Sequence, residues 1–263
     1  ERRKLARRVE ELEKSRSTPP SLPPRNETTR SDTPPPAGIG ELFSKLAELG
    51  LAGFRSPKFA ETLEAVKKGG TASLEYLSKV LRTSTSAPDR FFAAALLEGA
   101  ADPAGLPGLV EALKGDGDEM VRRMASHAIA VLGAPEGAAA LREAASGDPD
   151  WGVRVNSAYG LAKLQQEDGL KILREAYESS ETPTEYRLAV LGGLADVAAP
   201  STAPLFRKIL TDTQDVSYLL ASIGALEKMR DTEALPALEN LAGSSSSQIV
   251  KQAALKAIGA IRN

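Results

Sequence analysis

The chain has 263 residues, 42% of them hydrophobic, and is therefore long enough to bury a continuous core. Its formal net charge of −2 gives no support to nucleic-acid binding, which usually shows as a strongly basic face. Because the chain has no cysteine, disulfides and thiolate chemistry are excluded, and no run of roughly 18 apolar residues predicts a membrane span.

The beginning of the chain differs in composition from the rest. Residues 1–16 hold seven Lys or Arg and four Glu, with Leu5, Val9 and Leu12 on one side of a predicted short basic helix. Residues 17–38 are rich in Pro, Ser and Thr, which predicts an extended, poorly ordered linker. Such a pair of segments is common beside a membrane anchor or after a targeting segment. An anchor upstream of residue 1 and a cytoplasmic, membrane-tethered or periplasmic location all stay open.

The third predicted segment, residues 39–263, is a helical domain. A short helix over residues 41–49 is expected to cap it, and a first, degraded unit begins at Pro57. In that unit only the second helix matches the pattern of the later units. Its matching leucines are Leu74, Leu77 and Leu81.

The following part of the chain repeats with a period of 32 or 33 residues. Eight residues after each anchor of the repeat stands Leu or Ile, and twenty residues after all but the last stands Leu or Phe. A fixed period of this length is typical of a solenoid, in which each unit contacts mainly its neighbours. The six anchors are Asp89, Val121, Val153, Tyr186, Tyr218 and Val250.

The apolar spacing within one unit predicts two helices. In the unit that starts at Val121, the apolar residues form one stripe on a helix, and Gly133 and Pro135 separate it from a second helix. No unit shows the two-residue alternation of a strand. We therefore predict an all-α fold, a right-handed α-solenoid (superhelix) of about six helical hairpins.

One hairpin illustrates the expected packing. In the unit at Val153 we expect Leu161 and Leu173 to face each other. The small residue Gly160 is expected to allow the two helices to approach closely. Its role is therefore interpreted as helix packing rather than chemistry.

Short polar side chains three residues before the anchors predict where the first helices begin. Such a side chain accepts a hydrogen bond from the first turn, which contributes about 1 kcal/mol. The unit at Tyr186 departs from the pattern with Pro183 at this position, so we expect Thr182 to cap its helix instead. The other predicted caps are Ser86, Asp118, Asp150, Asp215 and Ser247.

Two of the units resemble a known repeat. The run DEMVRRMA at residues 118–125 with AIAVLG at residues 128–133, and the run at residues 150–164, resemble the short HEAT-like repeats of the bilin-lyase (PBS lyase) type. The resemblance covers roughly residues 86–263 and implies an ARM-type α-solenoid. It also implies an interaction module, since most proteins with such repeats bind other proteins and a minority attach or detach chromophores.

Candidate catalytic chemistry is sparse. The only histidine, His127, lies in a first helix and is expected to be structural or surface-exposed. A histidine–cysteine metal site is impossible without cysteine, and a single helical histidine supports no Ser-His-Asp triad. We therefore expect no catalytic residue, no cofactor and no metal.

Two columns of basic residues recur along the units. The first resembles the arginine ladder of HEAT repeats, in which the side chains bind carboxylates and carbonyls between repeats. Its members follow the anchors directly and are Arg90, Arg122, Arg154, Arg187 and Lys251. The second column lies on the second helices and consists of Arg142, Arg174 and Arg207, beside a column of Glu111, Glu143 and Glu175.

The second column has two interpretations. It is either a solvated face with weak ion pairs or a charge-patterned concave groove that binds a protein or peptide. Because Lys208 takes the place of a glutamate beside Arg207, we expect that end to be locally basic and to bind an acidic segment. The only tryptophan, Trp151, is either an exposed anchor for a partner or partly buried against a turn.

These patterns favour a non-catalytic scaffold for protein–protein interaction. Its candidate partner-binding residues are Arg142, Arg174, Arg207, Lys208 and Trp151. The partner is expected to be a protein or peptide, with no nucleic acid. The alternative is a bilin-lyase-like or other protein-modifying enzyme, or its accessory subunit.

Overall fold

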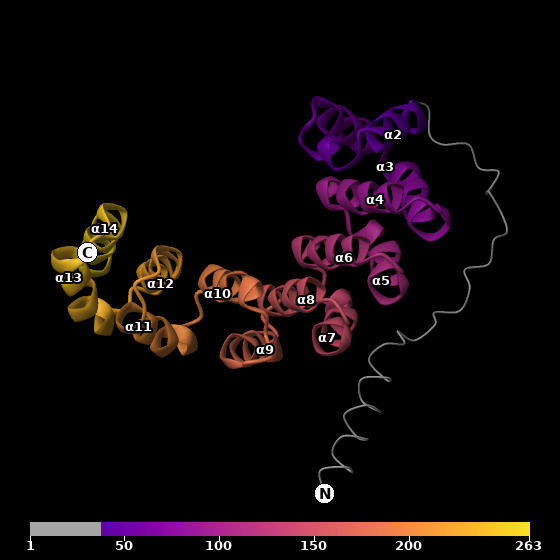
Figure 1. The fold of residues 1–263 in the computed structure, drawn as a ribbon. Coiled ribbons are helices and arrows are strands. Elements are labelled where there is room, and N and C mark those ends of the chain that lie inside the picture. The colour runs from indigo at the N-terminus through magenta and orange to yellow at the C-terminus, as the bar shows by residue number, and fades with distance from the viewer. Residues whose placement is uncertain (1–37) are drawn as a thin grey trace, which may run out of the picture. The chain divides into compact units, whose positions relative to one another are not determined.

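The computed structural model describes residues 38–263. The predicted basic helix over residues 1–16 and nearly all of the predicted linker, residues 17–37, lie outside the described residues. Within the described range the chain is all α, with thirteen α-helices and no strand (Figure 1). The predicted fold class is confirmed.

The described part begins with a capping segment. Helix α2 (Ile39–Glu48) buries Ile39, Phe43 and Leu46, and a 3-10 turn, η1 (Gly50–Arg55), leads into α3 (Pro57–Thr83). At Gly70 the backbone of α3 turns to φ 56°, a conformation that glycine adopts at little cost, and this breaks the helix into two segments. The second segment buries the three leucines of the predicted degraded unit, namely Leu74, Leu77 and Leu81.

Five complete hairpins follow, and a single helix, α14 (Gln248–Arg262), ends the described chain. The first helices of the hairpins are α4 (Ala87–Ala100), α6 (Glu119–Leu132), α8 (Trp151–Lys163), α10 (Thr184–Val197) and α12 (Val216–Met229). The second helices are α5 (Leu106–Gly115), α7 (Ala138–Gly147), α9 (Glu167–Glu178), α11 (Ala203–Asp212) and α13 (Leu235–Ser244). Short 3-10 turns precede four of the second helices, at η2 (Pro103–Gly105), η3 (Pro135–Gly137), η4 (Pro200–Thr202) and η5 (Thr232–Ala234).

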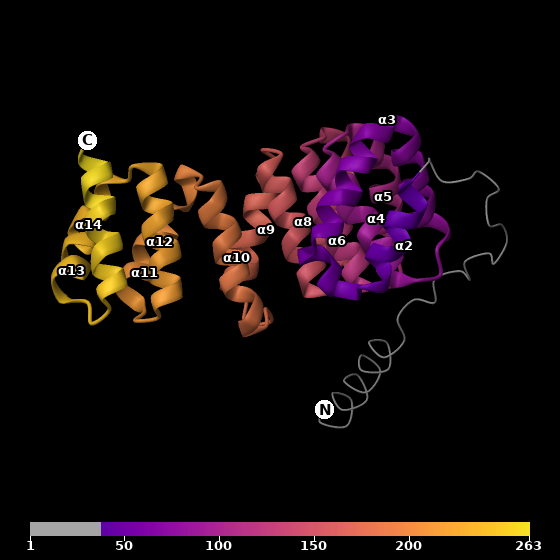
Figure 2. The same ribbon diagram turned by 90° about the horizontal axis from the view of Figure 1, so that it is seen from above.

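The helices form two layers. Each first helix packs on the first helix of the next unit, from α4 through α6, α8, α10 and α12 to α14 (Figures 1 and 2). The second helices lie beside them as the other layer, and each also contacts the first helix of the following unit. The stacked hairpins are the predicted α-solenoid.

The two apolar columns of the repeat form the core between these layers. Every residue of both columns is buried, because each one faces the partner helix of its own hairpin or a neighbouring hairpin. The column on the first helices is Leu97, Ile129, Leu161, Leu194, Leu226 and Ile258, and the column on the second helices is Leu109, Leu141, Leu173, Phe206 and Leu238.

The predicted caps are confirmed with one exception. Each of the side chains of Ser86, Asp118, Asp150, Asp215 and Ser247 accepts a backbone N–H at the start of its helix. The prediction for Thr182 is wrong, because α10 begins at Thr184 with Pro183 as its uncapped first neighbour. The Thr182 hydroxyl points into the protein instead, and its Oγ1 is buried without a hydrogen-bond partner.

The close approach expected at Gly160 occurs at a different interface. A Cβ atom there would lie 3.0 Å from both Ala130 Cβ and Leu141 Cδ1, which belong to the preceding hairpin. Gly160 therefore lets two hairpins approach. The tight contact within its own hairpin falls at Gly169, where a Cβ would lie 2.4 Å from the backbone nitrogen of Ala162.

Candidate partner-binding site

The first rung of the arginine ladder is a buried ion pair. Arg90, on α4, donates from Nε to Oδ2 of Asp116 at 2.7 Å and from Nη2 to Oδ1 at 2.8 Å. Its Nη1 donates to the backbone carbonyl of Ser84 at 3.0 Å. The hydrogen bonds to Asp116 raise the pKa of Arg90 above its ordinary value. The guanidinium is thus satisfied by the end of its own hairpin and the end of the preceding one.

The second rung repeats this geometry. Arg122 donates from Nε and Nη2 to the carboxylate of Asp148 at 2.8 and 3.0 Å, and from Nη1 to the carbonyl of Asp116 at 2.9 Å. The fourth rung is satisfied differently, since Arg187 donates to the carbonyls of Thr182 and Ser179. The predicted ladder function is therefore found at these three rungs.

The third rung lacks its acid. Arg154, on α8, has a buried Nε with no hydrogen-bond partner. Its guanidinium carbon instead lies 3.6 Å from the centre of the Trp151 ring. Stacking on an aromatic face leaves the in-plane N–H groups of an arginine available to an acceptor. Arg154 is thus a cation whose ladder partner is missing.

The missing partner has an identifiable place. At the end of each second helix, one short polar side chain accepts the backbone N–H of the residue two positions later. This C-cap column consists of Ser84, Asp116, Asp148, Ser179, Thr213 and Ser245. Asp116 and Asp148 bind the arginines of their own hairpins, so Ser179 holds the position from which a carboxylate would reach Arg154.

The connection after this position is also longer. Tyr186 comes seven residues after Ser179, whereas Val153 comes five residues after Asp148. The extra length places Thr182 inside the protein with its hydroxyl unpaired. Both departures from the repeat therefore fall at the same end of the same hairpin.

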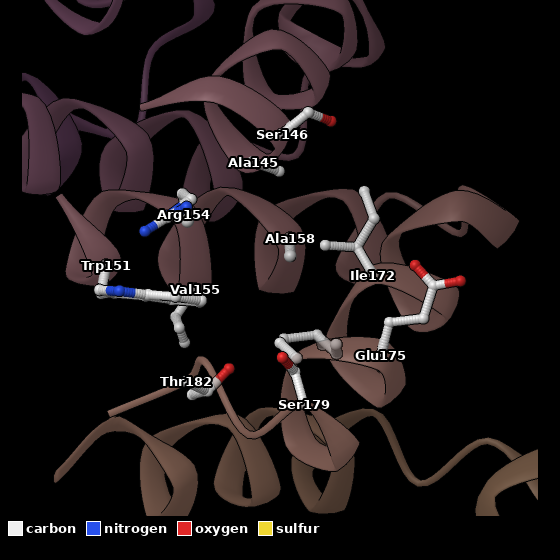
Figure 3. Close-up of a pocket in the computed structure, with 12 residues that line it drawn as sticks. Ala145, Ser146, Trp151, Arg154, Val155, Ala158, Ile172, Glu175, Ser179 and Thr182 are labelled. Carbon is white, nitrogen blue, oxygen red and sulfur yellow. The ribbon is translucent and has the colours of Figure 1, made fainter. Parts of the chain in front are cut away.

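A pocket of about 210 Å³ opens at this point, lined by α7, α8, α9 and the connection to α10 (Figure 3). Arg154 and Trp151 lie at one side of it, and Ser179 and Thr182 lie along another (Figure 3). Small and apolar residues make up most of the remaining wall: Ala145, Val155, Ala158, Ile172, Leu173 and Ala176. The polar residues of the lining are Arg154, which has no ion-pair partner among the described residues, the hydroxyl residues Ser146, Ser179 and Thr182, and Glu175. An apolar wall with one available cation is an arrangement suited to a ligand with one anionic group.

The first turn of α8, which carries Trp151, is fixed by a charged cluster. Asp150 caps the helix by accepting the N–H of Val153 at 2.9 Å. Arg123 of α6 donates to both carboxylate oxygens of Asp150, at 2.6 and 2.5 Å, and to the hydroxyl of Tyr186 at 3.0 Å. The bonds from Arg123 hold the pKa of Asp150 below its ordinary value. This cluster ties three successive first helices together next to the pocket.

Two of the three arginines predicted on the second helices are already paired. Arg142 binds Asp168 of the next unit, and Arg207 binds Glu233 as well as Asp231, the latter at 3.2 Å. Lys208 lies 3.9 Å from Asp212. The expected local basic charge around Arg207 and Lys208 is therefore offset by three carboxylates.

Arg174 differs from the other two. It is exposed on α9, and within residues 38–263 no acidic side chain forms an ion pair with it. Asp168 and Glu233 stand fifteen residues after their anchors, and the corresponding residue in the intervening unit is Ser201. The column thus contains one exposed arginine without a carboxylate, and it lies on the helix that lines the pocket.

The sequence contains one tryptophan and one histidine, and the structure describes both. Trp151 is half-buried, which corresponds to the second of the two predicted positions, and it forms a wall of the pocket. His127 is exposed, and its Nδ1 lies 2.9 Å from Glu98 on the preceding first helix. This hydrogen bond raises the pKa of His127 above its ordinary value. The structural interpretation of His127 agrees with this contact.

Sequence reasoning did not single out Arg154, Ser179 or Thr182 as site residues. The signal was available for two of them, because an aspartate at the end of two second helices is replaced by serine in the third, and the connection there is longer. Among the described residues, no cluster of three or more His, Asp or Glu is arranged to hold a metal ion. None of the helices in the described range is long and apolar enough to cross a membrane.

Comparison with known proteins identifies one family and two similar folds. A family model of HEAT repeats matches residues 74–151, 106–184 and 179–259. The complex of CpcE and CpcF of phycocyanin lyase from a Nostoc species is similar over 90% of this chain and 92% of the other, with 19% identity and a TM-score of 0.47. Human deoxyhypusine hydroxylase is similar over 85% of this chain and 96% of the other, with 18% identity and a TM-score of 0.39. No curated protein matches the chain significantly.

Proposed function

This chain belongs to the HEAT-repeat family, with matching repeats over residues 74–259, and from that premise we propose that it is a non-catalytic scaffold for protein–protein interaction. The proposed binding surface is the layer of second helices around α9. Stacked repeats present a continuous surface along which an extended partner segment can contact several units. The partner is proposed to carry an acidic segment.

The observation that carries this proposal is the exposed, unpaired Arg174. In both neighbouring members of its column, an acidic residue of the following unit already neutralises the arginine. At Arg174 the corresponding position is Ser201, so the charge is available to a carboxylate from another chain. An acidic partner segment would complete the row of ion pairs across the solenoid.

The other predicted residues have supporting roles in this proposal. Arg142, Arg207 and Lys208 flank Arg174 along the same layer. The ion pairs of Arg142 and Lys208 are exposed and therefore weak, whereas the pair between Arg207 and Asp231 is largely buried. Trp151 contributes its ring at the pocket between α7 and α9. The only histidine, His127, is bound to Glu98 on the other layer and so takes no part in the proposed surface.

Charge reversal at Arg174 tests the proposal. A partner recovered by crosslinking to the full chain should bind the Arg174→Glu variant at least about tenfold more weakly at low salt, and the difference should shrink as salt screens the charges. Lys68→Glu is a matched control, because Lys68 is exposed on α3 and the change in net charge is the same. Equal loss in both variants would indicate a response to net charge alone and contradict the proposed surface.

A further inference from the structure

We propose that the pocket at Arg154 binds the side-chain carboxylate of an Asp or Glu from a protein partner, in the place that a ladder aspartate occupies in the two preceding hairpins. The inference rests on the proposed function as a protein-binding scaffold and specifies a second contact, distinct from Arg174. The occupant is an internal acidic residue of an extended segment.

The first argument is the comparison of successive rungs. In the hairpins of Arg90 and Arg122, an aspartate carboxylate accepts two N–H bonds from one guanidinium. Arg154 occupies the same position in its hairpin, but Ser179 stands where the aspartate would be, and Nε has no acceptor. A buried N–H without a partner is costly, and a carboxylate from another chain would remove that cost.

The second argument is the chemistry of the rest of the pocket. The Thr182 side chain is only 2% exposed, lines the pocket, and has an Oγ1 without a partner. Its O–H, buried in the structure, would donate to a carboxylate oxygen placed next to it. Ser179 Oγ already accepts the N–H of Glu181 at 3.1 Å, and its own O–H is available as a second donor. One guanidinium and two hydroxyls are thus available to a single anionic group.

The third argument concerns the charge and shape of the ligand. Glu175 also lines the pocket, and its carboxylate lies across from Arg154, 3.8 Å from Lys171 (Figure 3). A dianion such as phosphate would be repelled by Glu175 more strongly than a single carboxylate would be. The apolar wall formed by Val155, Ala158 and Ile172 accommodates an aliphatic neighbour of the acidic residue. The favoured segment is therefore acidic and apolar in adjacent positions.

Ser179→Asp tests the proposal by supplying the carboxylate from within the chain. Aspartate at the equivalent positions, Asp116 and Asp148, makes the same C-cap hydrogen bond, so the substitution is compatible with the turn. The variant should unfold at a higher temperature and should no longer bind an acidic ligand. Ser179→Asn keeps the shape without the charge and serves as the matched control. Arg154→Met should also abolish binding.

The probe is the capped peptide acetyl-Gly-Asp-Leu-Gly-amide, compared with the corresponding Asn peptide. Trp151 is the only tryptophan, so its indole N–H signal in an NMR spectrum reports on this pocket alone. The Asp peptide should shift that signal and bind at least about tenfold more tightly than the Asn peptide, the effect of losing charge-assisted hydrogen bonds. Equal binding of the two peptides, or binding by Ser179→Asp as tight as by the parent chain, would overturn the proposal.

A third peptide distinguishes another source of the carboxylate. If acetyl-Gly-Asn-Leu-Gly with a free C-terminus bound and the capped Asp peptide did not, the pocket would recognise a chain terminus and the proposal would be wrong. The scaffold surface at Arg174 and the carboxylate site at Arg154 are tested separately. A partner that lost affinity for Arg174→Glu but not for Ser179→Asp would support the scaffold surface and contradict the Arg154 site. No loss in either variant would contradict both.

Discussion

Two successive hairpins, α6 with α7 and α8 with α9, follow the same repeat. Their ladder arginines nevertheless have different partners. In the first hairpin, Arg122 is bound by Asp148 at the end of its own second helix. In the second, Arg154 is stacked on Trp151 and finds a serine at the equivalent place. One unit therefore satisfies its ladder internally, while the next leaves a cation and a pocket open to a ligand.

The comparison shows that stability and binding capacity are distributed unequally along a solenoid. Ladder pairs such as Arg90–Asp116 are buried and bidentate, and removal of one partner leaves a charge that the interior cannot solvate. At Arg154 the same charge is retained without that partner. The unpaired N–H of Arg154 carries a desolvation cost that an acceptor from a ligand would offset.

The largest expected effect comes from breaking the first rung. Asp116→Ala should lower the free energy of unfolding by about 3–5 kcal/mol, because Arg90 would remain buried without its carboxylate. Urea denaturation followed by circular dichroism measures this. Glu111→Ala, which removes an exposed acid 3.8 Å from Arg82, is the control and should cost less than about 1 kcal/mol. Similar losses in the two variants would mean that burial of the ladder does not matter.

The second effect compares glycines at the start of two second helices. Gly169→Ala should cost about 1–3 kcal/mol, because its Cβ would lie 2.4 Å from a backbone atom, the nitrogen of Ala162. At the same position in an earlier hairpin, Gly105→Ala would meet the movable end of Leu97, Cδ2, at 2.9 Å. Melting temperatures of both variants measure the difference. A larger decrease in melting temperature for Gly105→Ala would contradict the prediction that the contact at Gly169 is the less tolerant one.

The third effect tests the contribution of Arg154, a ladder arginine without an aspartate partner. Arg154→Met should change the free energy of unfolding by less than about 1 kcal/mol, since the loss of stacking on Trp151 is offset by removal of an unpaired N–H. Arg122→Met should cost clearly more, because Asp148 would be left without its cation. Chemical denaturation of the two variants under the same conditions gives the comparison. If both substitutions lowered the free energy of unfolding equally, the presence of the aspartate partner would not affect stability.

The smallest effect is a pH dependence of stability that arises from Asp196, in the layer of first helices. Asp196 of α10 accepts the Tyr159 hydroxyl at 2.7 Å and lies 3.3 Å from Lys163 and from Lys228. These contacts lower its pKa from 3.8 to about 2. A depressed pKa contributes stability above the unfolded value, and that contribution is lost as the pH falls from 3.8 toward about 2.

Asp196→Asn should therefore be less stable than the parent chain at neutral pH, by a modest amount because the cluster is exposed. The difference between the two proteins should decrease over the acidic range and vanish at its lower end. Thermal unfolding over a pH series measures both curves. A difference that stayed constant with pH would show that Asp196 contributes through packing rather than through its charge.

The fold was predictable from the sequence because the residues that determine it recur in successive units. The apolar columns at Leu161 and Leu173 and the caps at Asp118 and Asp150 recur with one period, so each unit supports the interpretation of the others. The site was less predictable because it arises where the period fails. Thr182 was expected to cap a helix on local grounds, but a longer connection turns its hydroxyl inward, a tertiary effect that spacing alone does not reveal.

The sequence placed the arginines of the second helices in one column, but it did not identify the acidic residues that pair with two of them. Asp168, Asp231 and Glu233 belong to the following units, and their distance from Arg142 and Arg207 depends on how successive hairpins stack. A sequence pattern shows which residues share a column but not which neighbours in the next unit reach it. Arg174 and Arg154 therefore became distinct only once the hairpins were placed side by side.

The C-cap column explains how a repeat can change its role without changing its shape. The turn needs only a side-chain oxygen that accepts the N–H two residues later, and serine, threonine and aspartate all supply one. Only aspartate also binds the ladder arginine of its hairpin, as Asp116 and Asp148 do, whereas backbone carbonyls bind Arg187 in the hairpin that ends at Thr213. Asp148→Ser would remove the carboxylate from Arg122 and Ser179→Asp would supply one to Arg154, so the two changes together would move the arginine without a carboxylate by one unit along the solenoid. Designed arrays of this repeat could thus encode the spacing of acidic residues in their targets through a single position per hairpin.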